Sequence, residues 1–99
     1  MSEAVRHVHV RGRVQGVGFR MFVEDAAAMH RVEGWVRNRR DGSVEAVFAG
    51  TPEAVRAVIE ACRRGPRGGW VEAIDESDGT AEMLGWRHRG ERFSVLRTE

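Results

Sequence analysis

The amino-acid sequence predicts an α+β fold in which one antiparallel sheet carries two helices on one face. Residues 5–12 alternate apolar and polar side chains, as a half-buried strand does, and residues 19–30 repeat apolar side chains at helical spacing. A second helix start at residue 51 follows a hairpin-like stretch, residues 34–49, and precedes a strand-like one, residues 70–74. This order of elements is the split βαββαβ arrangement of a ferredoxin-like sandwich.

The first strand places Val8 and Val10 on one face and His7, His9 and Arg11 on the other. Two histidines on one strand face are potential metal ligands, but no Cys or carboxylate nearby in the sequence completes a site. The pattern therefore favours an exposed polar strand face, and we expect no metal site.

The helix predicted for residues 19–30 has an apolar stripe at steps of three and four residues. The stripe comprises Phe19, Phe22, Ala26, Met29 and Val32. Aromatic side chains could instead stack on RNA bases, yet helical spacing indicates that Phe19 and Phe22 belong to the core.

The hairpin turns at Asp41-Gly42, and its register decides where Asn38 points. A two-residue turn would split the apolar side chains between both faces of the sheet. A three-residue loop, 40–42, pairs Asn38 with Val44 and gathers the apolar set on the inner face. On that register Asn38 points inward and needs a hydrogen-bonding partner, although capping of a local turn remains an alternative.

The sequence also predicts a second helix and a short last strand, and it leaves one segment between them unassigned. Thr51 caps a helix whose first residue is Pro52, and an apolar stripe runs along it to an end near residues 63–66. Residues 93–97 predict a short last strand. Residues 76–92 match no pattern, and we expect the side chains within them at positions 87–89 (Arg87, His88 and Arg89) to be solvated.

The composition and net charge of the chain exclude several classes of function. The 99 residues predict one domain, 1–99, and 16 basic against 15 acidic side chains give a net charge of +1. This balance supplies no field that would attract nucleic acid or an anionic membrane. Cys62 is the single cysteine, so no internal disulfide forms, and no apolar run approaches the roughly 18 residues of a membrane span. We expect a cytoplasmic monomer.

The chain is organised around residues 12–20, where three glycines (Gly12, Gly16 and Gly18) lead into the first helix. Glycines let backbone N–H groups approach a ligand closely, and the first N–H groups of a helix are unpaired and attract anions. Arg20 is unfavourable at the positive end of a helix unless an anion lies beside it. No Gly-Lys-Ser/Thr sequence or third glycine follows, so neither an ATP loop nor a dinucleotide fingerprint is present.

Residues 12–20, together with 34–38 and 41–45, resemble the two signature stretches of the acylphosphatases. The resemblance covers the whole chain. It implies hydrolysis of a small-molecule acyl phosphate to a carboxylate and inorganic phosphate, with no cofactor. The residues suit that chemistry, since phosphoryl transfer requires mainly positioning and charge stabilisation.

The site residues follow from the same stretches. We expect the backbone amides of the loop, with the Arg20 guanidinium, to bind the phosphate, and Asn38 to orient the attacking water. The loop residues are Gln15, Gly16, Val17, Gly18 and Phe19. Gln15 and Asn38 are the only side-chain amides in the chain.

Two alternatives remain open. A non-catalytic ferredoxin-like module that binds RNA or a small anion would keep the glycine-rich loop but would not need Asn38. An accessory domain that cleaves carbamoyl phosphate within a larger maturation enzyme is the other.

Overall fold

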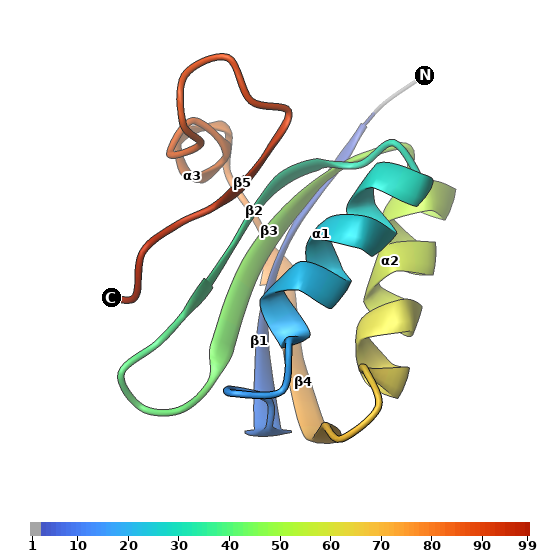
Figure 1. Ribbon diagram of the computed structural model, residues 1–99. Helices are drawn as coiled ribbons and strands as arrows, with labels where there is room; N and C mark the ends of the chain where they lie inside the picture. The colour runs from blue at the N-terminus through green and yellow to red at the C-terminus, as the bar shows by residue number, and fades with distance from the viewer. Residues whose placement is uncertain (1–2) are drawn as a thin grey trace.

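The computed structural model describes residues 3–99 as one sheet with two long helices (Figure 1). Its strands are β1 (Ala4–Arg13), β2 (Glu33–Asn38), β3 (Val44–Gly50), β4 (Trp70–Asp78) and β5 (Phe93–Val95). Its helices are α1 (Phe19–Met29), α2 (Pro52–Arg64) and the short α3 (Ala81–Leu84). The predicted ferredoxin-like class is confirmed.

The sheet differs from the prediction in one respect, because it is mixed. Its strand order is β4-β1-β3-β2-β5, and β5 runs parallel to β2, whereas every other pair is antiparallel. The difference arises because the chain after β4 crosses the outer face of the sheet before it returns to the edge beside β2 (Figure 1).

Both long helices cover the same face of the sheet, as predicted (Figure 1). The core between them is built from Val8 and Val10 of β1, Phe19 of α1, Phe48 of β3 and Val58 of α2, all at most 2% exposed. Met29 does not belong to this core and is 78% exposed. The prediction failed there because a 3.6-residue period carries the tenth residue after Phe19 to the edge of the buried stripe.

The hairpin adopts the register predicted for a three-residue loop. Asn38 pairs with Val44, and the Arg39 N–H donates to the Ser43 carbonyl at 2.8 Å. Gly42 has φ +94°, which lies in the left-handed region that favours glycine. Asn38 therefore projects from the inner face of the sheet, towards the helices.

The second helix also begins as predicted. Thr51 Oγ1 accepts a hydrogen bond from the Ala54 N–H at 3.1 Å, and Pro52 occupies the first helical position. No helix within residues 3–99 is long and apolar enough to cross a membrane.

Residues 79–92 have a structural role that the sequence did not reveal, because they cover the outer face of β2 and β3. Trp35 is fully buried, donates from its indole N–H to the Met83 carbonyl at 2.7 Å, and stacks on Trp86 with ring centroids 5.7 Å apart. Arg87, expected to be solvated, donates to the carbonyls of Leu84 and Arg92. The neighbouring His88 and Arg89 are exposed, as expected.

Glu45 of β3 is a second feature of the outer face, and its carboxylate is almost fully buried. Its Oε1 accepts from Arg37 at 2.7 Å and from Arg39 at 3.3 Å, and its Oε2 lies 2.6 Å from His7 Nε2 and 3.7 Å from His9 Nε2. The potential ligand atoms of Glu45 and the two histidines lie within 4.8 Å of one another.

The two histidines thus have a carboxylate neighbour that their local sequence does not contain, and the expectation of an exposed polar strand face was wrong for them, since their side chains are 15% and 31% exposed. Glu45 reaches them from the neighbouring strand, a proximity that only strand pairing creates. Burial tends to raise the pKa of the Glu45 carboxyl, but hydrogen bonds from His7 and Arg37 outweigh this effect and hold the pKa below its ordinary value of 4.5. Burial lowers the pKa of His9 below 6.5, although Glu45 opposes this shift.

Replacing Glu45 by Gln should lower the free energy of unfolding by about 1–3 kcal/mol near neutral pH, because Arg37 and the histidines lose a charged acceptor. The folded-state pKa of Glu45 is below its unfolded value. Its stabilisation is therefore present above pH 4.5 and is lost as the pH falls through the folded-state pKa. Urea unfolding at a series of acidic pH values should show the wild-type and Glu45→Gln stabilities converging.

Glu72→Gln is the matched control, because it removes an exposed carboxylate from β4. We expect this variant to stay within about 0.5 kcal/mol of wild type. A Glu45→Gln deficit that remained constant down to the most acidic pH would contradict the assignment.

Candidate active site

The loop between β1 and α1 exposes a row of unpaired backbone N–H groups. Gly16 has φ +75° and Gly18 has φ +77°, and Gly18 is also the N-cap of α1. None of the N–H groups from Gly16 to Phe19 donates a hydrogen bond within residues 3–99. Alternation of left-handed glycines with ordinary residues turns successive N–H groups into one concavity, which binds anions.

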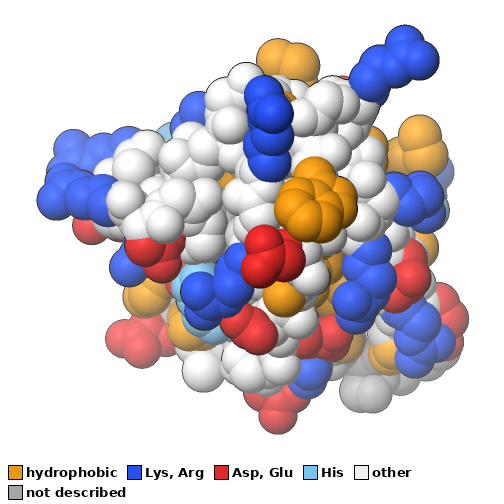
Figure 2. Space-filling view, turned by 90° about the horizontal axis from the view of Figure 1, so that it is seen from below, with side chains coloured by type: hydrophobic (Ala, Val, Ile, Leu, Met, Phe, Trp, Pro, Cys, Tyr) orange, Lys and Arg blue, Asp and Glu red, His pale blue; other side chains and the backbone are white. Residues whose placement is uncertain are grey.

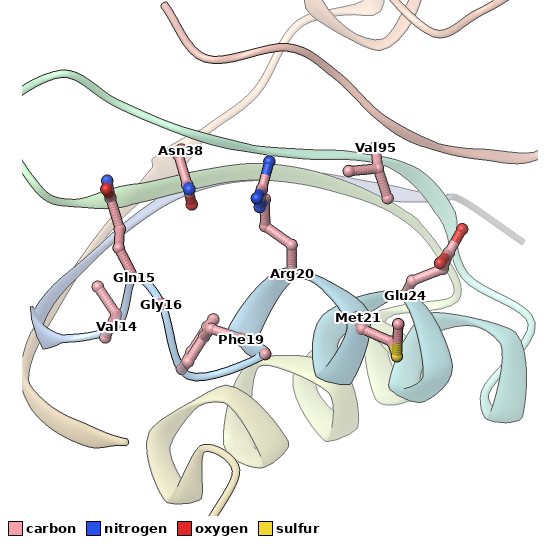
Figure 3. Close-up of a pocket in the computed structure, with 10 residues that line it drawn as sticks. Val14, Gln15, Gly16, Phe19, Arg20, Met21, Glu24, Asn38 and Val95 are labelled. Atoms are coloured by element: carbon pink, nitrogen blue, oxygen red, sulfur yellow. The ribbon is translucent and has the colours of Figure 1, made fainter. Parts of the chain in front are cut away.

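Arg20 follows directly in the first turn of α1 and is half-buried. Figure 3 shows its side chain rising from α1 towards the sheet, beside Asn38. No carboxylate within the described residues lies in ion-pair range of this guanidinium. Its planar fork is therefore available to an anion held by the loop.

Asn38 approaches the same space from the last position of β2 (Figure 3). Its Oδ1 is buried and has no hydrogen-bond partner within the described residues. A buried acceptor without a donor is costly, so this atom is suited to accept a hydrogen bond from a bound molecule.

Gln15 fixes the relative position of the loop and the hairpin. Its Nε2 donates to the carbonyl oxygens of Arg39 at 2.7 Å and Ser43 at 2.8 Å, which lie on the two sides of the hairpin loop. The sequence indicated only the backbone of Gln15, and its side-chain role was missed. The available signal was that Gln15 and Asn38 are the only amides in the chain.

These residues line one cavity of about 340 Å³. Of the expected site residues it contains Gln15, Gly16, Gly18, Phe19, Arg20 and Asn38. Val17 does not line it, because its side chain packs against the hydrophobic core. The cavity also contains residues that sequence reasoning did not select, namely Val14, Met21, Glu24 and Val95.

The side chains of the cavity favour charge stabilisation over covalent catalysis. The lining includes no Ser, Cys or His. Cys62, the single thiol, is buried in the core, and burial raises its pKa to about 12. A thiol with that pKa is not a nucleophile near neutral pH.

Figure 2 shows the molecule from below, the end at which the loop enters α1 in Figure 1. Basic and acidic side chains are interspersed on this face, in agreement with the net charge of +1. The positive character of the site is thus local, coming from Arg20 and the loop amides.

The chain is thus a small ferredoxin-like protein with a glycine-rich loop suited to an anion. Within residues 3–99, the guanidinium beside this loop has no ion pair and the buried Asn38 Oδ1 has no hydrogen-bond partner. The acylphosphatase family model matches residues 6–87. An acylphosphatase of Rhodopseudomonas palustris (strain BisB18) is 58% identical over 98 residues, which are 99% of each chain.

Solved structures agree with this match. The crystal structure of acylphosphatase from Bacillus subtilis has a TM-score of 0.80 at 35% identity, over 93% of this chain and 97% of that one. HypF of T. kodakarensis has a TM-score of 0.73 at 31% identity, over 96% of this chain but 12% of its own length. The chain therefore belongs to the acylphosphatase family, and the predicted enzyme class, a hydrolase of this family, is confirmed.

Substitution of Gly18 tests the loop geometry. A Cβ at Gly18 would meet no atom within 4 Å, but its φ of +77° should cost a side chain about 1–2 kcal/mol. We expect Gly18→Ala to fold with that loss of stability and to bind inorganic phosphate at least tenfold more weakly, because relief of the strain reorients the loop amides. Thermal melting and calorimetric titration measure the two effects.

Gly90→Ala is the matched control. Gly90 has φ +83°, also meets no atom within 4 Å, and lies outside the cavity. It should lose similar stability and keep its phosphate affinity. Equal weakening of phosphate binding in both variants would show that the loop has no special role.

Proposed function

We propose that this chain, acting as a single catalytic domain, hydrolyses acyl phosphates to a carboxylate and inorganic phosphate. The loop amides and the Arg20 guanidinium bind the phosphoryl group, and Asn38 orients the attacking water. Membership of the acylphosphatase family supports the reaction. Within residues 3–99 the N–H groups of Gly16 to Phe19 donate no hydrogen bond and Arg20 forms no ion pair, which supports the division of roles.

One observation carries the assignment of Asn38 to water. Its Oδ1 is a buried hydrogen-bond acceptor that has no partner in the part of the chain that the structure describes. An acceptor can accept a hydrogen bond from the O–H of a water, but it gains nothing from the acceptor oxygens of a phosphate dianion. The free atom therefore favours a water ligand over direct phosphate binding.

Hydrolysis of an acyl phosphate needs few groups beyond the loop amides, Arg20 and Asn38. The water oxygen forms a bond to phosphorus while the bond from phosphorus to the bridging oxygen breaks, and the bridging electron pair leaves with the carboxylate. One water proton stays on the new P–OH group, and the other moves to a phosphate oxygen. Because a carboxylate is a good leaving group, no strong base is needed, and an amide that cannot take a proton is sufficient.

The loop amides and Arg20 then stabilise charge that grows on the phosphoryl oxygens in the transition state. The described group of potential metal ligands, which contains Glu45, lies on the opposite face of the sheet from Asn38. We therefore propose a step that uses no metal ion.

Arg20→Lys should reduce kcat/KM by the equivalent of about 2–5 kcal/mol, because a point charge cannot replace the two parallel hydrogen bonds of a guanidinium. Inorganic phosphate should also inhibit the variant more weakly. Arg13→Lys, at an exposed residue outside the cavity, is the control and should behave as wild type. Near-normal rates and phosphate inhibition in Arg20→Lys would refute the role of Arg20.

Asn38→Ala should lower kcat for benzoyl phosphate by about 10²–10³, as expected for loss of one transition-state hydrogen bond. The inhibition constant of inorganic phosphate should change by less than about threefold. Asn38→Asp should in addition weaken phosphate binding, because its charge repels the anion.

Two outcomes would count against this role of Asn38. A phosphate inhibition constant that rose in parallel with the loss of rate would make Asn38 a phosphate ligand. A lowered melting temperature with unchanged activity per folded molecule would make it structural.

A further inference from the structure

The cavity extends beyond the groups that bind the phosphate. One water occupies about 30 Å³ of liquid, so a phosphate group with four oxygens occupies on the order of 100 Å³. The cavity measures about 340 Å³. Past Arg20 it is lined by Met21 and Glu24 of α1 and by Val95 of β5, none of which the phosphate requires.

Glu24 is the unexpected member of this lining. It lies one helical turn after Arg20 and therefore on the same face of α1. It is half-buried, and within residues 3–99 its carboxylate has neither a hydrogen bond nor an ion pair. In Figure 3 it stands on the far side of Arg20 from Gln15, near Val95.

A second cavity, of about 330 Å³, begins where the first one ends. Glu24 lines both cavities, and Phe93 of β5 lines the second. The second cavity also contains two arginines, Arg31 and Arg92. A chemical group that extends from the phosphate site into the space between α1 and β5 therefore reaches Glu24 before any other acidic side chain.

We propose that the acyl half of the substrate occupies this groove, with its apolar part against Met21 and Val95 and its far end beside Glu24. This subsite rests on the proposed function. Glu24 then selects the substrate by charge: it disfavours an acyl group with a second negative charge and favours one that carries a cation. The middle of the acyl group is bound because its apolar surface is removed from water. The half-buried Glu24 carboxylate interacts with a charge at the far end of the acyl group, and solvent ions screen this interaction only weakly.

The effect of Glu24 on substrate charge is stronger when the phosphate site is occupied. Arg20 is engaged by the phosphoryl group when substrate is bound, so it no longer offsets the charge of Glu24. Arg31 and Arg92 lie beyond Glu24 and oppose its effect, and only a longer acyl group would reach them.

Three benzoyl phosphates that differ only at the 4-position test the subsite: the parent compound, the 4-carboxylate and the 4-aminomethyl cation. We expect wild type to have a higher kcat/KM for the cation than for the carboxylate. Glu24→Gln should reduce this ratio by about fivefold to twentyfold, because two opposite charges each lose an interaction across a partly desolvated groove. Glu24→Lys should invert the preference.

Asp25→Asn is the matched control, since it removes the neighbouring carboxylate of α1, which is exposed and lies outside both cavities. It should leave the ratio unchanged. Comparison of ratios between variants cancels the electronic effect of each substituent on the leaving group.

The outcomes separate this inference from the proposed function. If wild type hydrolyses benzoyl phosphate but Glu24→Gln leaves the ratio unchanged, or Asp25→Asn alters it equally, the acyl subsite is refuted and the hydrolase remains. If wild type prefers the carboxylate substrate, the arginines control selection and the role of Glu24 is wrong. If wild type hydrolyses none of the three compounds, both proposals fail.

Discussion

The pairing register of β2 and β3 is the constraint on which the site depends. Asn38 lies opposite Val44, so its side chain faces the helices and the glycine-rich loop. A slip by one residue would turn every side chain of the strand to the other face and remove the amide from the site. The three-residue loop with a left-handed Gly42 sets this register locally.

Tertiary contacts on both faces of the sheet hold the same register. On the inner face, the Gln15 side chain bonds carbonyls on either side of the hairpin loop. On the outer face, Arg37 and Arg39 bond the buried Glu45 carboxylate from positions that flank Asn38. A slip would therefore break a buried ion-pair network as well as backbone hydrogen bonds, which makes alternative pairings costly.

The site separates two physical tasks among different elements. Backbone N–H groups and the α1 terminus supply fixed dipoles that need no reorganisation when charge develops. Two side chains supply what dipoles cannot: Arg20 of α1 supplies a planar cation, and Asn38 of β2 supplies a buried acceptor. In a chain with a net charge of only +1, this local concentration of donors suits the site to an anion without making the whole surface basic.

Much of the fold and site could be predicted because the relevant signals are local. Alternation in β1, helical spacing in α1, the Thr51 cap and the glycines of the loop each reflect interactions within a few residues. Local geometry also gave the hairpin register. The segment 79–92 escaped prediction because its order comes from covering Trp35, a residue distant in the chain.

Sequence alone was sufficient to predict a glycine-rich loop suited to an anion, an Arg at the start of a helix and an inward-facing Asn, because backbone torsions and side-chain periodicity dictate them. Three contacts became visible only in the fold: Glu45 meets two histidines, Gln15 connects the loop to the hairpin, and Glu24 lies in the groove beyond Arg20 with no partner among residues 3–99. These contacts join residues from different elements. Their proximity depends on how strands pair and helices pack, which no short stretch of sequence encodes.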